Sequence, residues 1–343
     1  MRRAAHLAIA LFLFVLAIEM MKRGGEAVAD GLNGNVLASN AVSTLGTGQV
    51  LAYVFLSGKP VAAFALALFA HGALTRLEAF TMLSGGRLGA AFIVLLVGFL
   101  YSLRSPNRRE SIGVGVVALT LTAVVYLPGM LLGYWLLRTG RLNGIRITLG
   151  GFEGVVGAVW GPVVDLMDRV LPAGLLLPLG GVLIILAVKL LDRGLPALDG
   201  SGGGRKVRRP WAMVALGFGV TLVTFSVSVA LTVLVPLAAR GLVRREEAIP
   251  YIMGANVATL ADTLLVAVLI GDPVGVQIVL AEAAAVTLVT AVLLGAVYRP
   301  LARGVVAFDD WVVGSRRRLA TFVAGLLAFP GVLLLGGTIL GQR

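Results

Sequence analysis

The chain has 343 residues, of which 58% are apolar and 13% are charged, and its formal net charge is +12 at pH 7. Soluble domains carry roughly 25% charged residues, so we expect a membrane protein rather than a soluble enzyme. The sequence has no cysteine, which excludes disulfides and cysteine metal sites. Its Lys and Arg residues form short patches between apolar runs, as in cytoplasmic loops, so nucleic-acid binding is not expected.

Two sets of segments in the chain resemble each other. Residues 11–24 (LFLFVLAIEMMKRG) resemble residues 182–194 (VLIILAVKLLDRG). At nearly the same offset, the matching residues are Ser57 with Ser226, Gly72 with Gly241, Arg76-Leu77-Glu78-Ala79 with Arg245-Glu246-Glu247-Ala248, and Gly85 with Gly254. Because the matches keep one order along the chain, they predict an internal duplication, as is common in transporters.

Hydropathy and helix breakers predict the elements of the first copy. Residues 4–21 form an apolar run longer than the roughly 7–15 residues of a signal peptide core. Because Lys22, Arg23 and Glu26 occupy the region where cleavage would occur, we expect a first membrane helix there. The remaining elements are an apolar stretch over residues 36–74, broken by Ser57-Gly58-Lys59-Pro60, and helices at about 83–103 and 112–137.

The second copy repeats this pattern after a connector. Residues 152–171 would place charged residues on one face of a helix and apolar residues on the other, which predicts an amphipathic helix on the membrane surface. The later elements are a helix at 174–191, an apolar stretch at 211–242 broken near Ser226-Val227-Ser228, helices at 252–270 and 274–297, and a last helix at 319–340. The predicted parts are therefore repeat one (1–138), the connector (139–173), repeat two (174–298), and an amphipathic segment with the final transmembrane helix (299–343).

The arms on either side of each break are too short for two full spans of about 20 residues, which favours re-entrant hairpins. Backbone at that depth is tolerated only where it is buried in protein or lines a wet cavity, so the hairpin tips are where we expect a site. Each copy then crosses the membrane three times, so the two copies are inverted. The predicted fold class is an all-α polytopic membrane protein with two inverted repeats and about seven full transmembrane helices.

The distribution of basic residues predicts the orientation. The face that bears the N-terminus would hold roughly twice as many Lys and Arg residues as the other face. This bias predicts a multi-pass protein of the plasma (cell inner) membrane, with the N-terminus in the cytoplasm and the C-terminus outside. Residues 197–210, which include five residues of Gly and Ser in a row, are expected to form a flexible cytoplasmic hinge.

Polar residues of the second copy are candidates for ion binding. Hydroxyls and freed carbonyls at a hairpin tip supply oxygen ligands for a dehydrated cation, although Ser and Thr also bond back to the preceding turn. Residues spaced three apart share one helix face, and an acid inside a membrane indicates a function unless it lies near a helix start. The candidates are Thr224, Ser226 and Ser228 at the tip, and Asn256, Thr259 and Asp262 on the helix face.

The first copy carries cations at the matching positions. Lys59 lies at the hairpin tip, and Arg87 lies in the segment Ser84-Gly85-Gly86-Arg87. Two cations at membrane depth would form a pocket suited to an anion, although Arg87 could instead extend to the surface. Glu282 is well inside its predicted helix and, with Asp262 as its rival, is a candidate proton carrier.

At these residues the sequence resembles the type II sodium/phosphate cotransporter family, whose copies each carry a Gln-Ser-Ser-Ser hairpin tip and a Gly-Ala-Asn-Ile-Gly-Thr-Thr segment. The matching segments are 225–228 (FSVS) and 254–260 (GANVATL) in the second copy, and 56–59 (LSGK) and 85–90 (GGRLGA) in the first. The resemblance covers most of the chain and implies sodium and phosphate as the transported ions.

The sequence departs from the family pattern at both hairpins. Apolar residues replace both glutamines, Lys59 replaces one serine, and Arg87 replaces the asparagine of the first copy. Because a lysine ammonium can mimic a bound sodium ion, we hypothesise that the first copy no longer binds Na⁺.

These observations predict a secondary transporter of an inorganic anion, with phosphate as the leading candidate, that works by alternating access. The predicted anion-binding residues are Ser57, Lys59, Arg87, Ser226, Ser228 and Asn256, and the predicted coupling residues are Thr224, Ser226, Ser228, Asn256, Thr259, Asp262 and Glu282. Coupling to Na⁺ through the second copy and coupling to protons are both open. No cofactor or metal is expected apart from Na⁺ as a possible coupling ion.

Other classes of function are weaker. There is no Walker sequence or dinucleotide motif and no convergent nucleophile and base, so an ATP motor or an enzyme is not expected. The alternative is a non-transporting scaffold or lipid-handling protein that retains the transporter fold; the missing glutamines favour it and the buried charges oppose it. Besides the lipid bilayer, a second copy is a possible partner, because Gly-rich helix faces allow close contacts.

Overall fold

The computed structural model describes residues 2–32, 40–103, 107–145, 147, 152–194, 209–224, 226–239, 241 and 243–341. Within these ranges the regular secondary structure is entirely α-helical, which confirms the predicted all-α class. The helices are α1 (Arg2–Leu32), α2 (Ala41–Phe55), α3 (Gly58–Ala70), α4 (Arg76–Ala90), α5 (Phe92–Ser102), α6 (Arg108–Arg138), α7 (Phe152–Val170), α8 (Ala173–Gly194), α9 (Pro210–Thr224), α10 (Val227–Thr232), α11 (Leu234–Ala239), α12 (Arg245–Ile270), α13 (Pro273–Ala296), α14 (Tyr298–Val313) and α15 (Arg316–Gly341). The predicted hinge at 197–210 lies mostly outside the described residues.

Five helical segments in the described residues are long and apolar enough to cross a membrane. They are Arg76–Ser102, which joins α4 and α5, together with α6, α12, α13 and the Arg316–Gly337 part of α15. Helices α1 and α8, which account for the other two of the seven predicted spans, are not among them. The apolar helices support a membrane-embedded protein, and the number of crossings stays a prediction.

Two of these helices begin earlier than hydropathy predicted. Helix α4 starts at Arg76 rather than at residue 83, because the Thr75 hydroxyl accepts the backbone N–H of Glu78 (3.3 Å) and the Glu78 carboxylate accepts that of Thr75 (2.7 Å). Helix α12 starts at Arg245 rather than at residue 252, where Glu247 accepts the backbone N–H of Arg244 (3.1 Å). Hydropathy finds the apolar part of a helix and misses a polar first turn that hydrogen bonds cap.

The break in the first apolar stretch is narrower than predicted. Helix α2 ends at Phe55, Leu56 adopts a left-handed conformation (φ 52°), and α3 begins at Gly58. The Ser57 hydroxyl caps α3 by accepting the backbone N–H of Lys59 (3.4 Å). Lys59 and Pro60, predicted as part of the break, therefore lie in the first turn of α3, where proline costs little because that N–H has no partner in the helix.

The break in the second apolar stretch includes Ser226, as predicted, whereas Val227 and Ser228, also predicted as part of it, already belong to α10. Helix α9 ends at Thr224 and α10 begins at Val227. The Thr224 hydroxyl donates to the carbonyl of Val220 (2.8 Å) and also lies 3.2 Å from the Ser226 carbonyl. The first of these bonds goes to the preceding helical turn, which was the alternative to ion binding that the sequence left open. Beyond this point the chain continues as two short helices, α10 and α11, rather than as one arm.

One type of helix contact occurs twice in the structure. In each of the two contacts, two glycines each pair with a residue of the neighbouring helix so closely that an added Cβ would be within 2.1 Å of its backbone carbonyl oxygen. In the contact of α2 with α4 these pairs are Gly48 with Met82 and Gly85 with Leu45, and in the contact of α9 with α12 they are Gly217 with Tyr251 and Gly254 with Val214. Each residue of the second contact follows its counterpart in the first by 169 positions, as from Gly48 to Gly217.

We expect Gly217→Ala to lower the free energy of unfolding by about 1–3 kcal/mol, because the added methyl group would meet the Tyr251 carbonyl of α12 and force the helices apart. The matched control is Gly219→Ala on the same helix, where an added Cβ meets nothing within 4 Å. Its effect should stay within about 0.5 kcal/mol. Thermal unfolding of the two variants in detergent measures the difference, and equal stability of both would contradict the close contact.

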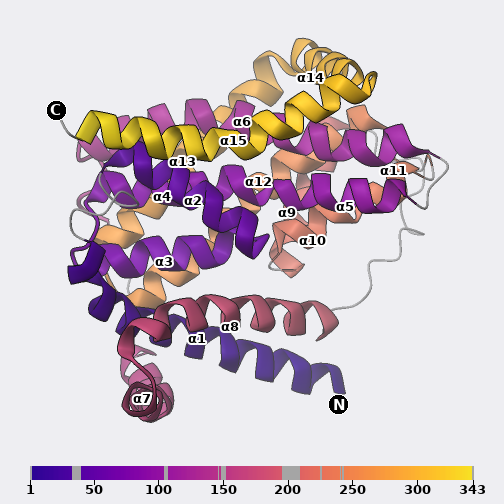
Figure 1. Ribbon diagram of the computed structural model, residues 1–343. Helices are drawn as coiled ribbons and strands as arrows, with labels where there is room; N and C mark the ends of the chain where they lie inside the picture. Colours follow the sequence, from indigo (N-terminus) through magenta and orange to yellow (C-terminus); the bar gives the residue numbers. More distant parts are fainter. Residues whose placement is uncertain are drawn as a thin grey trace.

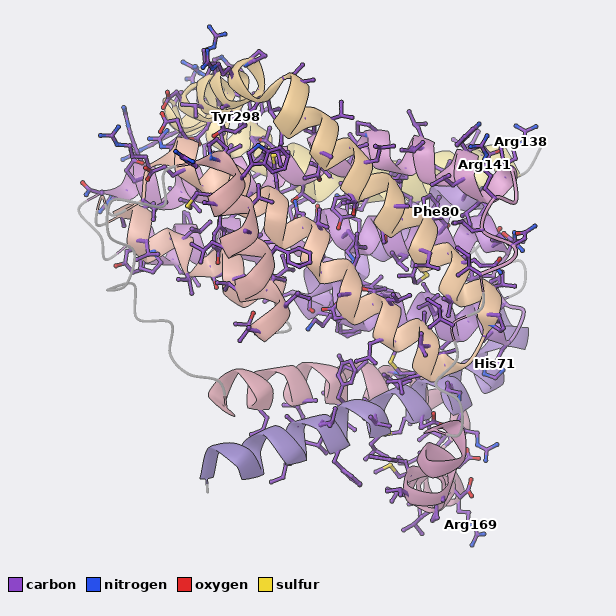
Figure 2. The ribbon with its side chains drawn as sticks, turned by 180° about the vertical axis from the view of Figure 1, so that it is seen from behind. His71, Phe80, Arg138, Arg141, Arg169 and Tyr298 are labelled. Carbon is purple, nitrogen blue, oxygen red and sulfur yellow. The ribbon has the colours of Figure 1, made fainter. Side chains whose placement is uncertain are left out.

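The helices that carry the candidate residues lie in the middle of the molecule. Figure 1 shows α1 and α8 side by side along one side, with α7 near their end and α15 along the opposite side. Between these layers α12 contacts α3, α6 and α13, and α4 contacts α3 and α6. In the opposite view Phe80 of α4 points into this interior, where it is fully buried, whereas Arg138, Arg141 and Arg169 extend outward (Figure 2).

The connector helix α7 is held against the first helix. Arg23 of α1 forms ion pairs with Asp165 (2.7 Å) and Asp168 (3.5 Å) of α7. The Trp160 indole N–H donates to the carbonyl of Phe12 (2.9 Å). These contacts place the polar face of α7 toward the charged end of α1, in keeping with the amphipathic pattern of its sequence.

Candidate functional site

Three charged side chains meet in the interior. The ammonium of Lys59, in the first turn of α3, lies 3.0 Å from Oδ2 of Asp262 on α12. The guanidinium of Arg87, near the end of α4, lies 3.7 Å from Oδ1 of the same carboxylate. Each of the three residues is at most 5% exposed. Two cations from residues 1–138 therefore share one carboxylate from residues 174–298, and we call this group the charge cluster.

Arg87 is tied to α12 by hydrogen bonds as well. Its Nη1 donates to the Thr259 hydroxyl (3.0 Å) and its Nη2 to the Thr259 carbonyl (3.3 Å). The side chain of Arg87 thus contacts α12. The alternative left open by the sequence, in which this side chain extends to the membrane surface, is wrong. Its Nε has no hydrogen-bond acceptor among the described residues, so one donor of the guanidinium is unused.

A second buried carboxylate lies beside the same face of α4. Glu282 of α13 is 1% exposed, and its Oε1 accepts a hydrogen bond from the Ser84 hydroxyl (2.9 Å). Its Oε2 has no hydrogen-bond partner in the described part of the chain. Ser84 and Arg87 are three residues apart on α4 and so share one face of that helix. Glu282 is therefore a neighbour of the charge cluster, held by a hydroxyl rather than by a cation.

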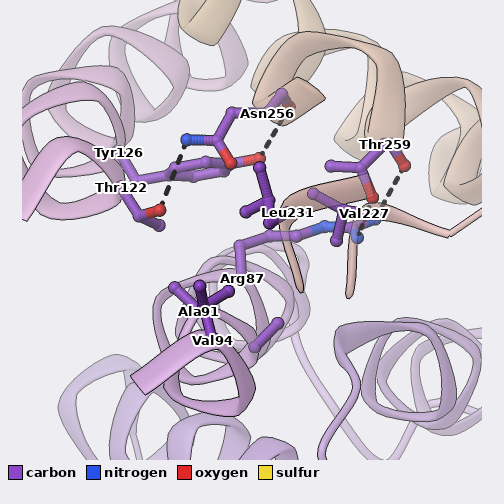
Figure 3. A pocket seen from close by; sticks show the side chains of 10 residues that line it. Arg87, Ala91, Val94, Thr122, Tyr126, Val227, Leu231, Asn256 and Thr259 are labelled. Atoms are coloured by element: carbon purple, nitrogen blue, oxygen red, sulfur yellow. Dashed lines mark hydrogen bonds between the residues drawn. The ribbon is translucent and has the colours of Figure 1, made fainter. Parts of the chain in front are cut away.

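A small cavity adjoins Arg87 (Figure 3). Its polar lining consists of Arg87, Thr122, Tyr126, Asn256 and Thr259, and its apolar lining comes from α4, α5 and α10. The side-chain amide of Asn256 donates to the Thr122 hydroxyl (3.3 Å), and the Tyr126 hydroxyl donates to the backbone carbonyl of Asn256 (3.1 Å). The cavity has a volume of about 10 Å³, room for one water at most. An ion as large as phosphate fits here only after the helices around it move apart.

The structure separates the predicted residues into two groups. Lys59, Arg87, Asn256, Thr259 and Asp262 come together at the charge cluster and the cavity, with Glu282 beside them. The other predicted residues are Ser57, the half-buried cap of α3 next to Lys59, and Thr224 and Ser226, which are buried at the second break. The side chain of Ser228 lies outside the described residues.

Three residues that sequence reasoning missed also belong to this region: Ser84, Thr122 and Tyr126. The signal for the last two was their spacing of four positions on α6, which places them on one face of that helix. That signal is weak, because Ser, Thr and Tyr in apolar helices often bond to backbone or pack in a core. Their partner Asn256 lies on another helix, and nothing in the local sequence identifies it.

The chemistry of the site is that of ion recognition. Among the described residues, no group of three or more Asp, Glu, His or Cys side chains is placed to hold a metal ion. The charge cluster instead combines two cations with hydroxyl and amide donors, in a buried setting where electrostatic interactions are stronger than in water. These groups match the oxygens of an anion.

Apolar helices of membrane length that enclose buried charged residues define a membrane-embedded protein with a candidate functional site. Residues 183–308 match the family model described as Na⁺/Pi-cotransporter. Over that part of the chain, from α8 to α14, the match confirms the resemblance to this family that the sequence predicted. No curated protein and no solved structure matches the chain.

Proposed function

We propose that this protein is a secondary transporter that moves an inorganic anion, with phosphate as the leading candidate, across the plasma membrane by alternating access. One observation carries the proposal: two buried cations of the first predicted copy, Lys59 and Arg87, face Asp262 of the second copy across a helix junction. A site formed between two halves opens to either side when the halves rock against each other. The family match to a phosphate transporter supports the choice of anion.

The packing supports two copies with re-entrant hairpins. The close glycine contact of α2 with α4 recurs between α9 and α12, at a constant offset along the chain. Helices α2, α3 and α9 have 15, 13 and 15 residues, fewer than the about 20 that a full span needs. In this proposal each pair of short arms enters and leaves the membrane on the same face, and the copies are inverted, with the N-terminus in the cytoplasm.

Each group of residues has a distinct role in the proposal. Lys59 and Arg87 neutralise the charge of the anion, while Asn256 and Thr259 donate hydrogen bonds to its oxygens. The two hairpin tips supply hydroxyl oxygens as further ligands for the transported ions, from Ser57, Thr224, Ser226 and Ser228. The coupling ion is Na⁺, as in the family, or a proton carried by Asp262 or Glu282.

Uptake of radiolabelled phosphate into proteoliposomes tests the function. We expect uptake by the purified protein that exceeds that of empty liposomes and responds to an imposed Na⁺ or proton gradient. A non-transporting scaffold or lipid-handling protein with the same fold would give no uptake under either gradient. That result would contradict the transport function.

We expect Lys59→Ser to make phosphate uptake dependent on Na⁺. The substitution removes a fixed positive charge from the hairpin tip and restores a hydroxyl, so a sodium ion can occupy the vacated space. Uptake with Na⁺ should then exceed uptake with K⁺ several-fold. The control is Lys22→Ser, since Lys22 is partly exposed and pairs with Glu19 (3.2 Å) outside the charge cluster. If the Lys59→Ser protein takes up phosphate at the normal rate whichever salt is present, Lys59 does not substitute for sodium.

A further inference from the structure

We propose, on the basis of the transport function above, that Asp262 takes up one proton when the anion binds and thereby couples phosphate transport to the proton gradient. The proposal rests on a shared contact. The Lys59 ammonium and the Arg87 guanidinium both lie against the Asp262 carboxylate, at 3.0 and 3.7 Å. An anion that reaches these two cations has to displace that carboxylate.

The charges of the site require a compensating ion. Lys59 and Arg87 both pair with the Asp262 carboxylate. A phosphate monoanion that takes both cations would leave this buried carboxylate without a cation, which is strongly unfavourable. One proton from solution that converts the Asp262 carboxylate to the carboxylic acid removes this cost. Phosphate then pairs with both cations, and the net charge of the site is unchanged.

A sodium ion is a poorer compensating ion at this point. It would have to lie next to two fixed cations, which repel it. A proton avoids that repulsion because it binds covalently to a carboxylate that is already in place. The Thr263 hydroxyl, which lies 3.1 Å from Oδ1 of Asp262, donates to the ionised carboxylate and is equally able to accept from the protonated one. Both forms of Asp262 therefore have a hydrogen-bond partner.

Helices packed against α12 bring few other titratable groups toward Asp262. Helix α3 supplies Lys59, α4 supplies Arg87, α13 supplies Glu282 and α6 supplies Tyr126, whereas α9 and α10 have none. Glu19 and Lys22 of α1 pair with each other, and Glu110 of α6 and the acids of α14 pair with Arg245 at the start of α12. Glu282 is therefore the one rival proton carrier in the described residues. It contacts the Ser84 hydroxyl rather than a cation, so the anion does not displace it.

One of the two cations, Arg87, adjoins a cavity from which the anion can reach it. Arg87 lines the cavity beside Asn256 and Thr259, and its buried Nε lacks an acceptor among the described residues. When Asp262 becomes neutral, the guanidinium can turn its free donors to phosphate oxygens without leaving a carboxylate unpaired. In this proposal the anion approaches Arg87 through the adjoining cavity.

Proton uptake on phosphate binding is the direct test. Inorganic phosphate is added to the purified protein in weakly buffered, mildly acidic solution, where phosphate is the monoanion, and the pH change and the bound phosphate are both measured. We expect one proton taken up per anion bound. Asp262→Asn, which imitates the protonated acid, should still bind phosphate but take up no proton. Asp165→Asn, an exposed acid that pairs with Arg23, is the matched control and should behave as the unaltered protein does.

Transport measurements supply the second test. An inward proton gradient should raise phosphate uptake into proteoliposomes several-fold in the unaltered protein. In Asp262→Asn, exchange of labelled for unlabelled phosphate should persist while the response to the gradient disappears. Phosphate binding without proton uptake in the unaltered protein overturns the proposal even if the variant does not fold, and so does loss of proton uptake in Glu282→Gln with retention in Asp262→Asn. Sodium-driven uptake that ignores the proton gradient overturns this inference but leaves the transport function standing, whereas no phosphate binding or uptake at all overturns both.

Discussion

Arg87→Gln is expected to abolish phosphate uptake. The substitution removes a buried cation that lies 3.7 Å from Asp262 and donates two hydrogen bonds to Thr259. Loss of one member of a buried charged pair at a binding site costs about 2–5 kcal/mol, which corresponds to an anion affinity lowered by roughly 30-fold or more. Phosphate binding to the purified protein and uptake into proteoliposomes measure the two effects.

A comparison of two substitutions at Arg87 separates the effect of its positive charge from that of its forked hydrogen-bond donors. Arg87→Lys keeps the positive charge but loses the forked pair of donors, so it should restore part of the phosphate affinity that Arg87→Gln loses. Arg141→Gln is the control, because Arg141 is exposed and lies over the Trp135 ring at 4.6 Å. A well-folded Arg87→Gln protein with unchanged phosphate affinity would show that Arg87 serves packing alone.

Arg245→Gln is expected to lower the free energy of unfolding by about 3–5 kcal/mol. Arg245 joins three helices: it pairs with Glu110 of α6 (2.6 Å) and with Asp309 (2.5 Å) and Asp310 (2.7 Å) of α14. The Asp309 side chain is fully buried, so without the guanidinium a buried carboxylate loses its cation. Thermal unfolding in detergent measures the loss. Arg303→Gln on the exposed face of α14 is the control, and a similar loss in both variants would contradict the role of the buried pair.

The same variant should show a distinct pH dependence. Burial raises the pKa of Asp309 from 3.8 to about 6, and the Arg245 guanidinium limits that rise. Because the folded state binds this proton more tightly than the unfolded state, the contribution of Asp309 to stability is largest below pH 3.8 and is lost as the pH rises through about 6. Arg245→Gln removes the cation that opposes the rise. Its destabilisation should therefore be greatest at neutral pH and shrink in mild acid.

A second substitution checks the assignment to Asp309. In Arg245→Gln combined with Asp309→Asn, no carboxylate is left buried at this position, so the part of the destabilisation that grows between mild acid and neutral pH should disappear. Stability curves of the single and double variants at several pH values make the comparison. If the pH dependence survives in the double variant, it does not arise from Asp309.

The apolar helices, one of the breaks and the two proposed copies could be predicted, because each depends on the residues of a short segment. The apolar runs and their breakers located α6, α13 and the second break at Ser226, since membrane insertion depends on the composition of each segment. The order of the matched glycines predicted two copies, and the close contacts of Gly85 and Gly254 now show why small residues stand there. The helix starts at Arg76 and Arg245 were missed, because capping hydrogen bonds rather than hydropathy decide them.

At the candidate site, the individual charged residues were predictable from the sequence, whereas their ion pairs were not. Lys59, Arg87, Asp262 and Glu282 stood out in the sequence because a charge within an apolar run is costly and needs a reason. Which charge pairs with which was not predictable: the sequence left Asp262 and Glu282 as equal rivals, and the packing of α3 and α4 against α12 places Asp262 between the two cations while α13 brings Glu282 to Ser84. Hydropathy, breakers and isolated charges are properties of short segments and can be read along the chain. Ion pairs depend on which helices pack together and at what rotation, and only the tertiary structure decides that.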